Sequence, residues 1–149
     1  MQPHFLPHIP PPHLQAALQS TDPQILLDLL ALPLHQELYR RQDFNFMDTL
    51  TMPQQLLLSY DYTLQQVQQG GFIQLLVNGY IGLLPDMPQW LTTIGATPMA
   101  QLIDDVLKVY VLNHHLFRQD MTPREFALLY DELKEFEILE TRYFALHPA

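Results

Sequence analysis

The serines and histidines of this 149-residue chain are the side chains whose types could support catalysis or metal binding. The serines are Ser20 and Ser59, and Ser59 stands in an expected helix without the Gly-x-Ser-x-Gly elbow that exposes a hydrolase nucleophile. His114 and His115 are adjacent, so on a helix their side chains would point about 100° apart and would not meet at one ion. Three further histidines lie in a proline-rich stretch, which cannot preorganise a metal site. The sequence therefore predicts a protein that is not an enzyme and that uses no metal or cofactor.

Acidic residues gather near the C-terminus, where seven acids and two bases lie between Asp120 and Glu140. On a helix, Asp131 and Glu135 would be about 6 Å apart along the axis, and Glu132 would reach the same face. Carboxylates at such a spacing can imitate the phosphates of a nucleic-acid backbone. An ordinary solvated helix face would contain the same acids, and this alternative stays open. The predicted partner-binding surface comprises Asp131, Glu132, Glu135, Glu137 and Glu140, with Asp104 and Asp105 as a second patch.

The net charge restricts the class of partner. Seven basic and sixteen acidic side chains give a formal net charge of −9 at pH 7. Such a chain is poorly suited to neutralise phosphates, so direct binding to nucleic acid or to an anionic membrane is disfavoured. Cysteine is absent, which excludes disulfides and thiolate chemistry. We expect no signal peptide and no membrane span, because the most apolar stretch, residues 71–85, is shorter than the about 20 residues that a spanning helix needs. The expected location is the cytoplasm.

The elements that must position these residues are helices. Five prolines in the first twelve residues predict an extended arm, residues 1–12, ahead of a helical domain over residues 13–149. Asp22 is expected to cap a helix that Pro33 ends, and Pro33 then opens a second short helix to about Arg41.

The rest of the chain keeps a helical period. We expect helix junctions at Gly70-Gly71, at Asn78-Gly79 and at Gly95. Thr97 is expected to cap the following helix, and Thr122 with Glu125 forms a capping box at the start of the last one. That last helix would bury Phe126, Leu129, Tyr130, Leu133 and Phe136. No stretch alternates as a strand would, so the predicted fold is all-α, a single compact domain of short helices.

Eight residues in the middle of the chain form a recognisable pattern: Gly70, Gly71, Phe72, Gln74, Asn78, Ile94, Gly95 and Ala96. In order and approximate spacing, this pattern resembles a bacterial family of domains of unknown function whose named member is a DNA-mimic protein. Gln69 stands where the family usually has Asn, and Leu75-Leu76 replace its aromatic pair. The resemblance covers about residues 53–110. The matched residues look architectural: the glycines allow sharp helix junctions, Phe72 is a core anchor, and the Gln74 and Asn78 amides could bond exposed backbone.

The resemblance implies an all-helical protein that sequesters a DNA-binding regulator by presenting carboxylates in the manner of phosphates. Binding of this kind would fall with salt. The alternative is a protein-interaction module of another kind, such as a toxin-neutralising immunity protein, whose binding would be insensitive to salt. Its surface would be an apolar patch formed by Tyr80, Ile81, Leu83, Leu84, Met87 and Trp90. Either hypothesis predicts a protein partner, and a homodimer is left open.

Overall fold

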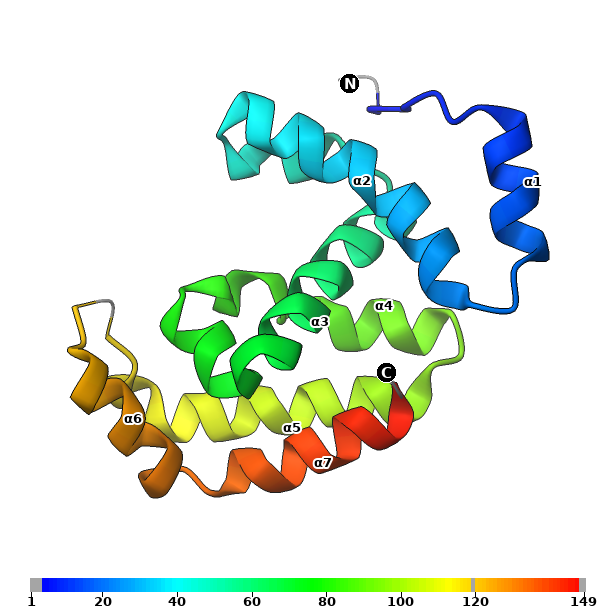
Figure 1. Ribbon diagram of the computed structural model, residues 1–149. Coiled ribbons are helices and arrows are strands. Elements are labelled where there is room, and N and C mark those ends of the chain that lie inside the picture. The colour runs from blue at the N-terminus through cyan, green and yellow to red at the C-terminus, as the bar shows by residue number, and fades with distance from the viewer. Residues whose placement is uncertain (1–3, 119, 148–149) are drawn as a thin grey trace. The chain divides into compact units, whose positions relative to one another are not determined.

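The computed structural model describes residues 4–118 and 120–147, and in that part of the chain all regular structure is helical, with no strand (Figure 1). The predicted all-α fold class is confirmed. By its internal contacts the chain divides into two compact units, one up to Asp61 and the other from Tyr62. The border lies within helix α3 (Met52–Val77). The domain limits expected from the sequence stay a prediction.

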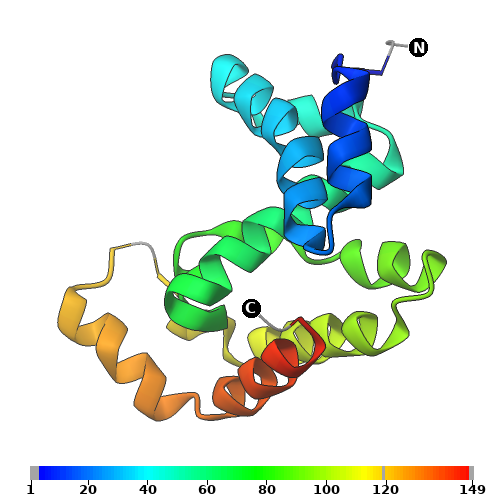
Figure 2. The same cartoon turned by 45° about the vertical axis from the view of Figure 1, so that its right-hand side comes forward.

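The first unit consists of the N-terminal arm, α1 (Pro11–Gln19), α2 (Pro23–Arg41), the 3-10 turn η1 (Phe44–Thr49) and the beginning of α3. Helices α1 and α2 pack side by side (Figure 2). Helix α1 begins at Pro11, so the last two residues of the expected arm, Pro11 and Pro12, are helical. The two prolines at its start are compatible with a helix because backbone N–H groups in the first turn have no intrahelical acceptor.

Helix α2 corrects one expectation, because it continues through Pro33 instead of ending there. Its cap is as predicted: the Asp22 carboxylate accepts a hydrogen bond from the backbone N–H of Gln24 at 3.0 Å. Proline inside a helix costs about 3 kcal/mol. Burial on both sides of the proline offsets this cost, since Ala31 and Leu34 are each only 1% exposed. Tertiary packing therefore overrides the local signal.

The second unit contains the rest of α3, η2 (Tyr80–Leu83), α4 (Met87–Thr93), α5 (Thr97–Asn113), η3 (His114–Leu116), α6 (Pro123–Glu132) and α7 (Glu135–Leu146). Helix α5 packs against α4 and α7 (Figure 1). Leu102, Ile103 and Val106 form an apolar stripe on α5 and are fully buried. The ring of Tyr143 meets that of Phe72 edge-on, with centroids 5.7 Å apart.

The helix junctions expected at the glycines are present. Within α3, Gly70 and Gly71 both leave the helical conformation, and Gly71 has φ 75° and ψ −174°, a region that only glycine adopts readily. Gly79 and Gly95 also have positive φ. The cap expected at Thr97 is wrong: Thr97 is the first residue of α5, and Ala96 precedes it with no side-chain cap.

The single last helix expected from Thr122 onward is divided in two, which is a further correction. Helix α6 ends at Glu132, Leu133 leaves the helical conformation with φ −113° and ψ 58°, and α7 begins at Glu135. No glycine or proline marks this break; buried side chains on both helices hold it. The Thr122 hydroxyl accepts from the Glu125 N–H at 3.2 Å as predicted, but the Glu125 carboxylate binds Arg118.

Candidate protein-binding surface

Four exposed carboxylates flank the break between α6 and α7. Asp131 and Glu132 end α6, while Glu135 and Glu137 lie in the first turn of α7. Within the described residues, none of the four forms an ion pair. We call these four residues the acidic turn. Because two helices contribute, the row of carboxylates expected along one helix face is not formed, and the acids instead surround a bend that also contains the exposed Lys134.

The helix ends affect these acids in opposite ways. The partial negative charge at the C-terminus of a helix disfavours nearby carboxylates by about 0.3–1 kcal/mol each, whereas the N-terminus favours them by a similar amount. Asp131 and Glu132 stand at the unfavourable end of α6, and Glu135 and Glu137 at the favourable end of α7. The two acids on α6 therefore do not serve the stability of their own helix.

Glu140 does not belong with these exposed acids. It is half-buried, and its Oε1 accepts a hydrogen bond from the backbone N–H of Phe72 at 3.0 Å. Burial raises the pKa of the Glu140 carboxyl, the Phe72 N–H opposes that rise, and the charge of Glu137 adds to it. Glu140 is thus a structural acceptor, and the interpretation of its carboxylate as a free surface charge does not fit its position.

In the second predicted patch, Asp104 and Asp105, basic side chains neutralise the negative charge. The Lys108 ammonium lies 3.0 Å from an Asp104 carboxylate oxygen, and the Arg142 guanidinium donates to Asp105 at 2.8 Å. The bond from Arg142 is the main reason that the pKa of Asp105 lies below its usual value. These acids link α5 to its own next turn and to α7, so they offer a partner less free charge than the acidic turn does.

The Gly-Gly-Phe segment is a kink held from two other helices. The Tyr130 hydroxyl on α6 donates to the Gly70 carbonyl at 2.5 Å, and Glu140 on α7 accepts from Phe72. A Cβ added at Gly71 would overlap the Glu140 carboxylate, so this glycine is needed for space as well as for its positive φ. Phe72 is fully buried, which confirms it as a core anchor. We call Tyr130 and Glu140 the kink clamp.

Sequence reasoning missed this clamp. Tyr130 is 60 positions from Gly70 along the chain, and Glu140 is 68 positions from Phe72. No local sequence motif predicts hydrogen bonds between residues so far apart. The amides of Gln74 and Asn78 also differ from expectation. Instead of bonding backbone, both donate to the side-chain oxygen of Gln66, at 3.3 Å and 2.7 Å.

The apolar patch of the alternative hypothesis is not exposed. Leu84 and Met87 are fully buried, and the four other members are half-buried. The exposed large apolar side chains of the second unit lie elsewhere, at Ile94, Val111, Leu112, Leu128, Ile138, Phe144 and Leu146. Leu128 and Ile138 belong to the same two helices as the acidic turn, so that region offers apolar area beside its charge.

The first unit contains a histidine–carboxylate pair that the sequence did not single out. The His35 imidazole Nε2 lies 2.6 Å from Oδ2 of the buried Asp61, which links α2 to α3. In the part of the chain that the structure describes, no three His, Asp or Glu side chains are grouped so that they could hold a metal ion. Nor does any helix of this part have the length and apolarity to cross a membrane.

Comparison with known protein families gives a match. The model of a family described as DMP19-like protein matches residues 48–149. The matched region contains all of α3 and the eight residues of the glycine pattern, whereas α1 and α2 lie outside it. No curated protein and no solved structure matches.

Proposed function

The chain belongs to the family of DMP19-like proteins, and on this premise we propose that it binds a DNA-binding protein in the place of DNA. The observation that carries the proposal is the acidic turn, whose four exposed carboxylates have no basic partner among the described residues. Two of them stand at a helix end that disfavours negative charge. Because Asp131 and Glu132 destabilise their own helix, a role in binding explains them better than a role in stability does.

The remaining electrostatics agree with such a decoy. The formal net charge of −9 attracts a basic DNA-binding surface over distances of about a Debye length, roughly 10 Å at 0.1 M salt. The kink clamp and the paired acids of α5 are excluded from the proposed surface, because their carboxylates already have partners. The protein would act by binding rather than by catalysis, and in the cytoplasm.

The test compares two variants of equal net charge as bait for partners in a lysate. The first neutralises the acidic turn with Asp131→Asn, Glu132→Gln, Glu135→Gln and Glu137→Gln. The matched control neutralises four exposed acids elsewhere, at Asp28, Asp48, Asp86 and Asp120, each changed to Asn. Bound protein is eluted with duplex DNA and, separately, with a salt gradient.

We expect the wild type and the control to capture the same protein, released both by DNA and by moderate salt, and the acidic-turn variant to lose it. Equal capture by all three baits would refute the acidic turn as the binding surface. A partner that resists both DNA and salt would instead favour apolar binding, with Leu128 and Ile138 as its first candidates. Far-UV circular dichroism of each bait checks that the helices are intact.

A further inference from the structure

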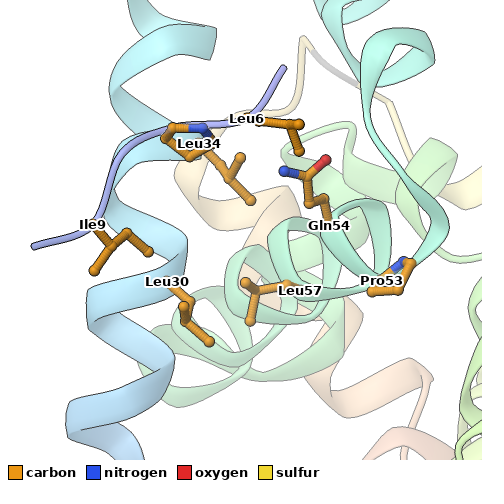
Figure 3. A pocket seen from close by; sticks show the side chains of 8 residues that line it. Leu6, Ile9, Leu30, Leu34, Pro53, Gln54 and Leu57 are labelled. Atoms are coloured by element: carbon orange, nitrogen blue, oxygen red, sulfur yellow. The ribbon is translucent and has the colours of Figure 1, made fainter. Parts of the chain in front are cut away.

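The N-terminal arm of the first unit lies over an apolar groove between α2 and α3 (Figure 3). Leu30 and Leu34 of α2 form one side of the groove, and Pro53, Gln54 and Leu57 of α3 form the other. Leu6, Pro7 and Ile9 of the arm complete the lining. None of these eight side chains carries a charge, and a volume of about 400 Å³ stays open between them. A cavity of that size is within the range of ligand-binding pockets.

The arm is held through its backbone and through the ring of Phe5, which meets the ring of the buried Phe46 edge-on with centroids 5.3 Å apart. The N–H of Phe5 donates to the carbonyl of Thr49 at 3.1 Å, and the side-chain amide of Gln54 donates to the carbonyl of Phe5 at 2.8 Å. Figure 3 shows the Gln54 side chain directed toward the arm. Bonds to backbone groups do not depend on the side chain at that position. In one recurring mode of peptide recognition, main-chain bonds likewise hold an extended peptide and pockets select its side chains.

The arm fits the groove incompletely. Along residues 4–10 exposure alternates, as in an extended chain: Phe5, Pro7 and Ile9 are half-buried, while their neighbours are exposed. Leu6 lines the groove and is nevertheless 76% exposed. An occupant that leaves such a volume open gives up the packing that a better-fitting segment would gain.

We propose that this groove is a docking site for an extended, proline-containing segment of a partner protein, uncharged and with apolar side chains at alternate positions. The chain's own arm occupies the groove until such a segment displaces it. The chemistry follows from the present occupant, which has this backbone conformation and spacing, and from the uncharged lining. As a tethered competitor the arm acts at an effective concentration in the millimolar range.

This site is independent of the proposed decoy function. Its residues lie in the first unit, and the arm and α2 are outside the region that the family model matches. The acidic turn lies in the second unit. Loss of one activity would therefore leave the other unaffected.

The experiment measures binding of a fluorescein-labelled peptide, His4 to Pro12 of this chain, to the full-length protein by fluorescence anisotropy. In the arm-released variant, Phe5→Asp with Ile9→Asp, the sides of the groove that α2 and α3 form are unchanged, but the arm is held less firmly. We expect this variant to bind the peptide at least about tenfold more tightly than the wild type, because the tethered competitor is removed. A peptide with the same two substitutions should not bind.

Groove variants locate the site. In the arm-released chain, Gln54→Ala and Leu57→Ala should each weaken binding, and Leu32→Ala, an exposed position of α2 outside this groove, should not. Equal peptide affinity for wild type and arm-released chain would overturn the proposal. So would an arm-released chain that loses its helical circular dichroism, since the arm would then be part of the core. A wild-type dimer that the peptide dissociates would make a second copy's arm the occupant instead of a partner protein.

Discussion

The kink clamp gives the sharpest test of how the second unit is held together. Glu140→Ala removes the acceptor of the backbone N–H of Phe72, a fully buried residue. An unsatisfied buried donor costs about 1–3 kcal/mol, so we expect the free energy of unfolding to fall by that amount. Trp90 is the only tryptophan and lies in the same unit. Its fluorescence during urea denaturation therefore reports the relevant transition.

Glu140→Gln separates the hydrogen bond from the charge, because the amide oxygen can still accept from Phe72. Burial raises the pKa of Glu140 in the folded protein above its unfolded value. The native state then binds the proton more tightly, so the contribution of this group is most favourable at low pH and is lost as pH rises through the folded pKa. The free energy of unfolding of Glu140→Gln, relative to that of the wild type, should therefore increase as the pH rises from 4 to 7.

Two results would refute this reasoning. If Glu140→Ala unfolds within about 0.3 kcal/mol of the wild type, the bond to Phe72 does not hold the kink. If the difference between Glu140→Gln and the wild type is constant from pH 4 to pH 7, burial does not raise the pKa of this carboxyl. As a control on the same helix, Glu137→Ala removes an exposed side chain and should lower the free energy of unfolding by no more than about 1 kcal/mol, the contribution of an acid in the first turn of a helix.

Three further substitutions test other parts of the structure. Gly71→Ala should lower the free energy of unfolding by at least about 1–3 kcal/mol, because the φ of this residue is positive and the added Cβ would overlap the Glu140 carboxylate. The control is Gly82→Ala, whose Cβ would lie in open space. In the same urea titration its free energy of unfolding should differ from that of the wild type by no more than about 0.5 kcal/mol. Asp105→Asn should cost no more than about 1 kcal/mol at pH 7, because the pair with Arg142 is partly exposed. Because the pKa of Asp105 is lowered in the folded protein, its pair with Arg142 stabilises the fold above the usual carboxyl pKa. The difference in the free energy of unfolding between wild type and Asp105→Asn should therefore vanish when denaturation is repeated at pH values that fall through the folded pKa. Pro33→Ala should raise the melting temperature followed by circular dichroism, since it restores a helical N–H inside α2; a lower melting temperature would contradict the view that burial carries this helix through an unfavourable residue.

Local chemistry determined several helix boundaries. Asp22 and Thr122 cap helices whose first residue is proline, and Gly71, Gly79 and Gly95 adopt positive φ at junctions. These features depend on a few neighbouring residues and on steric limits of the backbone, so the sequence alone determined them. The all-α class follows in the same way from the helical period of the apolar residues.

Only the tertiary structure determined which of the acidic side chains are exposed and which are buried or hydrogen-bonded. Five carboxylates near the C-terminus looked equivalent in the sequence, yet Glu140 is half-buried against Phe72 while Asp131, Glu132, Glu135 and Glu137 are exposed. The break at Leu133 and the continuity of α2 through Pro33 likewise have no local signal. In each case packing against residues distant along the chain contributes more free energy than the local preference. The sequence by itself determined which residues form helices and how much charge they carry; only the tertiary structure decided which charges are free to meet a partner.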